Sequence, residues 1–147
     1  ISIADFNNDG PLDFVVADRS ASGGKAFVYL NRGGLIFQSV NSSTGFPAPV
    51  AFGVDVADIN GDSFADFVIS NRKFTALEQI NIYISNGAAT PSFTATTITT
   101  TKASWFVKTA DFDGDSKPDI VVTSTNNVSS FSIDVWKNRN RGAALCI

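Results

Sequence analysis

The chain has 147 residues, of which 44% are apolar and 17% are charged, and its formal net charge is −3. This composition excludes an intrinsically disordered chain and offers no basic surface for nucleic acid. Histidine is absent and Cys146 is the only cysteine, which excludes imidazole-dependent catalysis, an intrachain disulfide and a cysteine-based zinc site. No apolar run reaches the roughly 18 residues of a membrane-spanning helix, so we expect none.

Short β-branched and aromatic segments, separated by Asn, Gly and Asp turns, follow one another from the first residue. Residues 1–53 predict strands at 1–3, 13–17, 28–31 and 35–40. The same order of strands returns twice. The second copy predicts strands at 52–56, 66–70, 82–85 and 92–98. The third copy predicts strands at 105–108, 119–123 and 135–138, and an incomplete fourth strand at 143–147. No segment has a helical periodicity of sufficient length.

Ten of the 14 acidic residues lie in three windows, 5–13, 58–66 and 111–119. Each window fits the pattern D-x-[DN]-x-D-x-x-x-D and starts 53 residues after the one before it. A fixed period of this size indicates a repeat architecture, and four strands per repeat are typical of a β-propeller blade, whereas a two-sheet sandwich gives no reason for the period. We therefore predict one all-β domain of about three propeller-type blades of four antiparallel strands, at 1–53, 54–106 and a truncated 107–147.

The spacing of the acids within each window predicts a calcium loop. Carboxylates at positions 1, 3 and 5 of a tight turn place oxygen atoms on one side of the backbone, and a main-chain carbonyl near position 7 commonly joins them. Three or four carboxylates within nine residues repel one another unless a cation neutralises them. A donor set made only of oxygen atoms favours Ca²⁺ over zinc or copper.

Two other interpretations of the windows were weighed. An EF-hand is excluded because position 12 is apolar (Val16, Ile69 and Val122) and a strand follows instead of a helix. Ordinary turns use the same Asp, Asn and Gly residues, but three copies in register favour a metal site. We expect the Asp at position 9 to supply a closing carboxylate.

The acidic windows and the strands after them resemble the FG-GAP/VCBS repeat family, the calcium-binding blades of integrin-α-like propellers. Phe52-Gly53 matches the family's Phe-Gly element, and the third repeat has Trp105-Phe106 there. The resemblance implies that each loop joins the first two strands of a blade and holds one Ca²⁺, about three per chain. The ligands that it implies are Asp5, Asn7, Asp9, the Pro11 carbonyl and Asp13; Asp58, Asn60, Asp62, the Phe64 carbonyl and Asp66; and Asp111, Asp113, Asp115, the Lys117 carbonyl and Asp119.

The resemblance also implies a setting and partners. Members close about six to eight blades, whereas this chain supplies just under three, so we expect further blades outside it, an assembly of several copies, or an open stack. An unclosed propeller exposes sheet faces and strand edges, which favours self-association. We expect an extracellular or cell-surface scaffold for adhesion or assembly. Asn41 and Asn127 begin N-glycosylation sequons.

Two alternatives concern other functions. The first is a glycan-binding protein, because related propellers bind glycans. The aromatic residues Tyr29, Tyr83 and Trp136 recur at matching places of the three repeats, and their rings could stack on a sugar or pack between neighbouring blades. Packing between blades is the simpler interpretation. A hydrolase with the carboxylate pair Asp111 and Asp113 is disfavoured, because these acids are spaced as a cation cage without a separate acid partner. We therefore expect no enzymatic activity.

Overall fold

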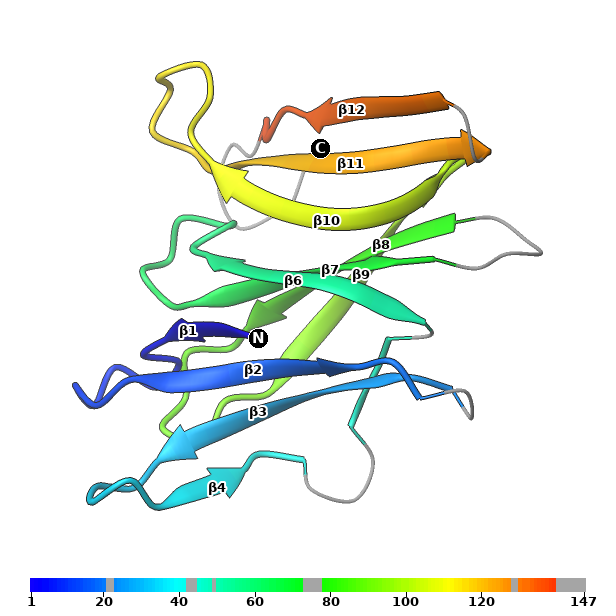
Figure 1. Cartoon of the computed structure of the whole chain (residues 1–147). Helices are drawn as coiled ribbons and strands as arrows, with labels where there is room; N and C mark the ends of the chain where they lie inside the picture. The colour runs from blue at the N-terminus through cyan, green and yellow to red at the C-terminus, as the bar shows by residue number, and fades with distance from the viewer. Residues whose placement is uncertain (21–22, 42–44, 49, 73–77, 128–129, 140–147) are drawn as a thin grey trace.

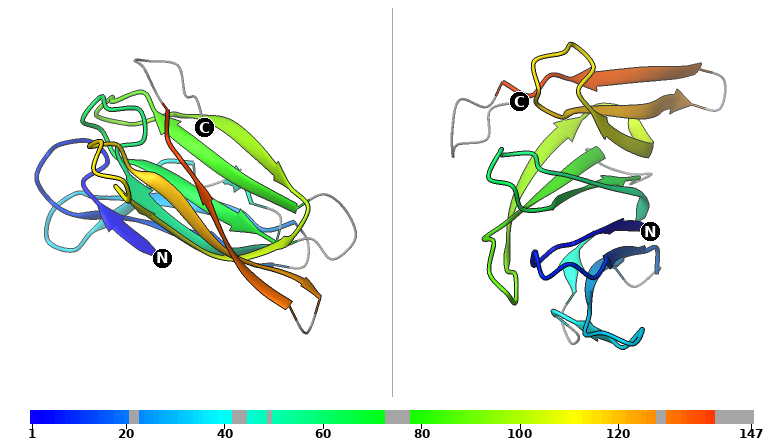
Figure 2. Two further views of the ribbon diagram at one scale, coloured as in Figure 1. Left: turned by 90° about the horizontal axis from the view of Figure 1, so that it is seen from above. Right: turned by 90° about the vertical axis from the view of Figure 1, so that its left-hand side faces the viewer.

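The computed structural model describes residues 1–147 except 21–22, 42–44, 49, 73–77, 128–129 and 140–147. The described part contains twelve β-strands and no helix. The strands form three antiparallel sheets that are stacked in chain order, with the first sheet at the bottom of Figure 1 and the third at the top. A view turned by 90° keeps the same order (Figure 2). The prediction of an all-β chain of propeller-type blades is confirmed.

The first sheet has the strand order β1-β2-β3-β4, and a short fifth strand pairs with β3. Its strands are β1 (Ser2–Ala4), β2 (Asp13–Asp18), β3 (Lys25–Asn31), β4 (Phe37–Ser39) and β5 (Phe46–Pro47). The sequence analysis missed β5, because a strand of two residues has no alternation to detect. Its register, Lys25 with Pro47 and Ala26 with Phe46, brings an aromatic ring onto the boundary with the second sheet.

The second sheet repeats this order without the extra strand, and the described part of the third repeats its first three strands. The second contains β6 (Ala51–Ala57), β7 (Asp66–Asn71), β8 (Glu78–Ser85) and β9 (Phe93–Thr100). The described part of the third contains β10 (Ala103–Ala110), β11 (Asp119–Asn127) and β12 (Ser130–Trp136). The repeat limits at 53/54 and 106/107 follow the period of the sequence and fall within β6 and β10. The predicted strand at 143–147 lies outside the described residues.

Two hydrophobic cores lie between the three sheets. The core between the first and second sheets is rich in aromatic rings, with Phe6, Phe67 and Tyr83 among its buried members. The core between the second and third sheets is mainly aliphatic, with Ile59, Ile82 and others. Strand β7 is buried along its whole length because both of its faces are covered.

Cation–π contacts recur between neighbouring sheets at the period of the repeat. The guanidinium of Arg19 lies 4.2 Å from the ring of Phe52, and that of Arg72 lies 3.8 Å from the ring of Trp105. Gly53 explains the Phe-Gly element, because a side chain there would lie 2.9 Å from the backbone nitrogen of Val107 in the third sheet. Each sheet is therefore fitted closely to the next one.

Candidate metal centres in three aspartate loops

The three acidic windows form loops on one side of the molecule, at the left of Figure 1. They join β1 to β2, β6 to β7 and β10 to β11, which are the first two strands of each sheet, as predicted. We call residues 5–13 the first loop, 58–66 the second loop and 111–119 the third loop, and number the positions in each from 1 to 9.

Positions 4 and 6 of every loop have a positive φ, which turns the backbone around the carboxylates. The residues and angles are Asn8 (54°), Gly61 (78°) and Gly114 (80°) at position 4, and Gly10 (102°), Ser63 (70°) and Ser116 (66°) at position 6. The left-handed region disfavours residues with a Cβ atom. Ser63 and Ser116, which stand where the first loop has Gly10, therefore keep the glycine-like conformation of the loop at a cost in strain.

The Asp at position 1 is held by backbone N–H groups of its own loop. In the second loop, Gly61 and Asp62 donate to Oδ1 of Asp58 at 2.7 and 3.0 Å, and Ser63 donates to Oδ2 at 2.7 Å. Asp111 accepts the three equivalent bonds, and Asp5 accepts two. A carboxylate has about four lone-pair sites, so these contacts fix its direction and leave capacity for a cation.

Positions 3 and 5 differ between the loops. In the first and second loops an Asn at position 3 donates to the Asp at position 5, with 2.8 Å for both Asn7 to Asp9 and Asn60 to Asp62. In the third loop position 3 is Asp113, and carboxylate oxygens of positions 1, 3 and 5 lie within 4.8 Å of one another. These three exposed carboxylates form a cluster that could bind a metal ion.

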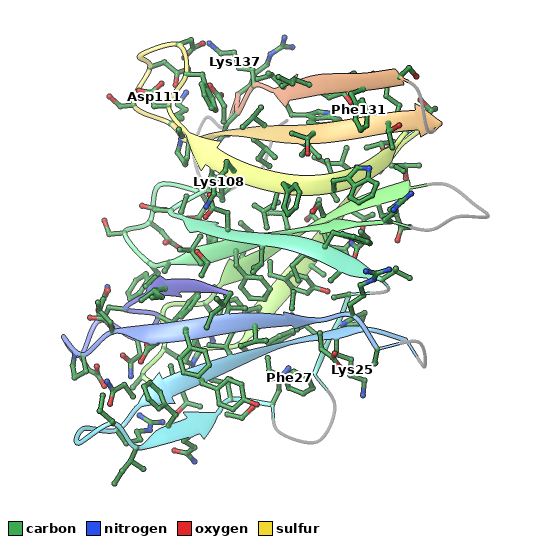
Figure 3. All side chains as sticks on the ribbon, in the orientation of Figure 1. Lys25, Phe27, Lys108, Asp111, Phe131 and Lys137 are labelled. Atoms are coloured by element: carbon green, nitrogen blue, oxygen red, sulfur yellow. The ribbon has the colours of Figure 1, made fainter. Side chains whose placement is uncertain are left out.

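Lys137 supplies a positive charge to the third loop. Its Nζ contacts Asp113 and lies 3.3 Å from Asp115 (Figure 3). The hydrogen bond from Lys137 lowers the pKa of Asp113, and the same bond raises the pKa of Lys137. The corresponding residues Leu30 and Ile84 are apolar, so this internal cation belongs to the third repeat. The sequence analysis did not assign it, although its place in the repeat was visible.

The Asp at position 9 is buried and links two parts of its sheet. One oxygen of Asp66 accepts the N–H of Ile59, at position 2 of the loop, and the other accepts the N–H of Ser85, the last residue of the third strand of its sheet. Asp13 and Asp119 accept the equivalent two bonds. The partners at the ends of the third strands are Asn31, Ser85 and Asn138, of which Asn138 lies two residues beyond β12. Sequence reasoning missed these three partners; their recurrence at one place in each repeat was the available signal.

Burial perturbs the carboxyl groups of Asp66 and Asp13. Burial raises the pKa of Asp66 to about 6 although its backbone hydrogen bonds act in the opposite direction, and it raises the pKa of Asp13 for the same reason. Both oxygens of each position-9 carboxylate accept an N–H group, so ligation by Asp13, Asp66 and Asp119 stays a prediction. Ligation by the carbonyls of Pro11, Phe64 and Lys117 also stays a prediction.

The donor set fits a hard cation. The described side chains at positions 1, 3 and 5 are carboxylates and amides, whose oxygen atoms are the ligands that calcium prefers. The loop backbone and the N–H groups hold these side chains on one turn. The side chains that could hold a calcium ion are Asp5, Asn7 and Asp9; Asp58, Asn60 and Asp62; and Asp111, Asp113 and Asp115.

A groove of about 600 Å³ lies between the second and third loops, lined by residues of 57–61, 109–110 and 116–118. Its lining contains no aromatic side chain. Tyr83 is 2% exposed, stacks on Phe67 at 4.6 Å and donates its hydroxyl proton to the carbonyl of Pro47. The packing interpretation of Tyr83 is therefore confirmed, and this ring offers no platform to a sugar.

A comparison with protein families matches the profile described as an FG-GAP-like repeat to residues 5–69 and 71–122. The two matches together span most of the chain and include all three loops. None of the curated proteins compared with the chain matches it significantly. Within the described residues, no helix has the length and apolarity to cross a bilayer.

Proposed function

Because the chain belongs to the FG-GAP-like repeat family, we propose that it is a calcium-stabilised scaffold of an extracellular protein that serves adhesion or assembly and has no catalytic activity. The β-propeller-like repeat framework follows from the family and the three stacked sheets. What we propose beyond this framework is that the loops bind calcium, that the protein is extracellular and that it has no catalytic activity.

One observation carries the calcium proposal. Three loops with the same backbone turn and equivalent carboxylate contacts recur on one side of the stack, although their common pattern fixes the residue type at only four of the nine positions. Backbone N–H groups orient the carboxylate at position 1 in all three. A bound cation would neutralise the clustered acids and lock each loop to the first two strands of its blade.

The geometry supports a non-catalytic role for the acids. Asp111 accepts three backbone hydrogen bonds, and its oxygens lie within 4.8 Å of those of Asp113 and Asp115. Glycosidase carboxylates stand farther apart, at roughly 5–9.5 Å, to leave room for a sugar and water. The side chain of Glu78, outside these loops, is beyond the described residues.

The extracellular setting rests on the family, whose repeats are typical of extracellular proteins. Millimolar calcium outside cells suits loops of moderate affinity. We propose N-glycans at Asn41 and Asn127, whose sequons run into residues that the structure does not describe. The glycan-binding alternative gains no support, because Tyr83 is buried and the groove between the loops lacks aromatic rings.

The test is thermal unfolding of the whole chain in excess calcium and in chelator, together with calcium titration by calorimetry. We expect about three ions per chain and a reversible rise in melting temperature, because a ligand at 100 times its Kd stabilises the folded state by about 2.7 kcal/mol per site. Asp58→Asn should remove one ion. Asp18→Asn is the matched control, since Asp18 is an exposed aspartate outside the loops.

An identical melting temperature in calcium and in chelator would contradict the proposal. So would a loss of calcium in Asp18→Asn equal to that in Asp58→Asn. In both cases the loops would be ordinary turns on a propeller-type framework.

A further inference from the structure

The large apolar side chains that are exposed lie at the two ends of the stack. The first sheet and its turns expose one set and the third sheet another, while the described second sheet exposes none. The exposed residues at the two ends are Ile1, Ile3, Leu12, Leu35, Ile36 and Phe37, and Phe106, Phe112, Phe131, Ile133 and Val135. The second sheet is covered on both sides, so the exposed sets mark two faces that have no neighbouring sheet.

The boundary between the first and second sheets shows how such a face is covered. Phe6, at position 2 of the first loop, is fully buried and meets Phe67 and Phe93 edge-on at 6.3 and 5.9 Å. Phe67 stacks on Tyr83 at 4.6 Å and meets Phe93 at 5.0 Å. Phe46 of β5 meets Phe67, Tyr83 and Phe93 at 5.6, 5.3 and 5.2 Å. We call a Phe/Tyr/Phe group of this kind an aromatic seat, and Phe6 and Phe46 of the first sheet fill it together.

The first sheet carries a second aromatic seat on its outer side. Phe14 stacks on Tyr29 with ring centres 5.0 Å apart and meets Phe37 at 4.9 Å. Phe14 and Tyr29 take the places of Phe67 and Tyr83 in the repeat, and the interplanar angles of the stacked pairs, 23° and 17°, are close. This seat has the composition and geometry of the internal one, and Phe37 is 39% exposed.

The third sheet carries a matching occupant at the other end. Phe112 is at position 2 of the third loop, as Phe6 is in the first, but it is 56% exposed. On the same sheet Ile133 and Val135 of β12 are exposed, whereas Ile80 and Ile82 at the equivalent places of β8 are fully buried against the third sheet. Figure 3 places β12, with Phe131, at the outer end of the stack.

We propose that a second copy of this chain docks head to tail, with Phe112 of one copy in the seat of Phe14, Tyr29 and Phe37 of the other. The interface continues the internal one between the first and second sheets at the place of Phe6, which Phe112 takes; Phe46 has no counterpart among the described residues of the third sheet. Asn138 donates to the carbonyl of Ile59 across the boundary between the second and third sheets at 2.8 Å. Asn31 is the equivalent residue of the first sheet and is placed to donate to the carbonyl of Phe112. This inference rests on the propeller-like framework of the proposed function.

The number of sheets sets the size of the assembly. A head-to-tail contact is heterologous and closes into a ring only when the rotation per copy permits it. The described part of each copy brings three sheets, so two copies of these 147 residues would make a ring within the range of roughly four to eight blades that propellers adopt, and three copies would exceed it. We therefore expect a closed dimer of twice 15.6 kDa.

The contact between copies is weaker than the internal one at two further places. The position at which Gly53 permits close approach of the next sheet is occupied in the third repeat by the bulky Phe106. The position at which Arg19 and Arg72 make cation–π contacts is occupied there by Thr125, which has no positive charge. The dimer should therefore dissociate on dilution, and Phe106→Gly should tighten it. A weaker dimer in Phe106→Gly would contradict the register.

The experiment is sedimentation velocity of the full chain over a wide concentration range, in calcium and in chelator. We expect a monomer–dimer equilibrium that Phe112→Asp shifts to monomer by at least tenfold in concentration, and that Tyr29→Ala shifts likewise from the opposite face. Thr96→Asp is the control, because Thr96 is exposed on β9 of the second sheet, outside both faces. Circular dichroism establishes that each variant folds.

A mixture of Phe112→Asp with Tyr29→Ala tests the head-to-tail arrangement itself. The mixture retains one intact interface, between Phe112 of the second variant and the seat of the first, and should form a heterodimer that neither variant forms alone. Parent chain that stays monomeric at every concentration, or a dimer that Phe112→Asp leaves unchanged, would overturn the proposal. A dimer that forms equally in calcium and in chelator would support it independently of the calcium proposal.

Discussion

The second and third loops have nearly the same backbone, yet their residues at position 2 have opposite environments. Both loops turn through positive φ at positions 4 and 6, within a few degrees of each other. Ile59 of the second loop is 1% exposed, whereas Phe112 of the third is 56% exposed. The difference comes from the neighbouring sheet, because Ile59 belongs to the hydrophobic core between the second and third sheets. Burial in a stacked repeat is therefore decided by the next repeat and not by the loop itself.

The two loops also differ in charge. The second has Asn60 at position 3 and, among the described residues, no lysine ion pair, whereas the third has Asp113 there and Lys137 beside it. The third loop thus carries one more acid, and Lys137 provides a cation next to it. The same backbone turn therefore carries two different charge arrangements, and the acids of the third loop are partly neutralised by a lysine of the chain.

Truncating the two residues at position 2 should give the largest contrast. Ile59→Ala should lower the free energy of unfolding by roughly 2–5 kcal/mol, because it leaves a cavity between the second and third sheets. Phe112→Ala should change it by less than about 0.5 kcal/mol in dilute protein, because this ring is exposed. Urea unfolding of both variants measures the contrast, and equal losses would show that Phe112 is buried within a single chain.

Asp66 should make the stability of the second repeat depend on pH. Its folded pKa is about 6 against an ordinary value of 3.8, because burial disfavours the charged form. Between these values the folded state binds more protons than the unfolded state, so the free energy of unfolding should fall as pH rises from about 4 to about 6. We expect a loss on the order of 2 kcal/mol in metal-free buffer, measured by urea unfolding at each pH.

The variant Asp66→Asn should flatten this pH dependence, and an unchanged slope would contradict the assignment. Asp55→Asn is the control. Burial raises the pKa of Asp55, but hydrogen bonds from Lys108 and Thr109 outweigh it and hold the pKa below its ordinary value. The stability that Asp55 contributes is therefore lost only below about pH 4, outside the window of Asp66.

The features that the sequence predicted are local ones. The strands after each loop, the turns and the 53-residue period depend on residue types a few positions apart, and the structure has them where they were expected. The left-handed backbone at position 6 persists even where Ser63 replaces glycine. Local pattern was sufficient for the framework and for the positions of the candidate ligands.

The features that the sequence did not predict are contacts between distant segments. Phe6 is buried by Phe67 and Phe93, and Asn138 bonds to the carbonyl of Ile59, more than 50 residues away in each case. Phe6 and Phe112 are the same residue type at the same loop position, so no local rule separates the buried ring from the exposed one. Only the stacking of sheets assigns them different roles.

A smaller effect should follow from relieving strain at position 6. Ser63→Gly should raise the free energy of unfolding by about 0.5–1 kcal/mol, because glycine adopts a φ of 70° without steric cost. This net gain already includes an opposing effect, since glycine increases the conformational entropy of the unfolded chain. Ser116→Gly, with a φ of 66°, should do the same in the third loop. Melting temperatures in chelator measure both gains. A loss of stability in either variant would mean that the serine side chain stabilises its loop by more than the strain costs.

The mildest change should be a calcium effect confined to the third loop. Lys137→Leu restores the apolar residue type found at Leu30 and Ile84, and it removes the ammonium group beside Asp113 and Asp115. Calcium then competes with no internal cation, so the affinity of the third loop should rise several-fold, and the gain should shrink in high salt because exposed charges are screened.

The backbone amides of Gly10, Gly61 and Gly114 report separately on the three loops in a calcium titration followed by NMR, since one glycine lies in each. Only the midpoint for Gly114 should move to lower calcium. Lys25→Leu is the control, because Lys25 lies on β3 far from the third loop (Figure 3). An unchanged Gly114 midpoint would mean that Lys137 leaves the carboxylates freely when calcium binds. The third loop would then resemble the second in its need for an added cation, and the contrast in charge between them would carry no consequence for binding.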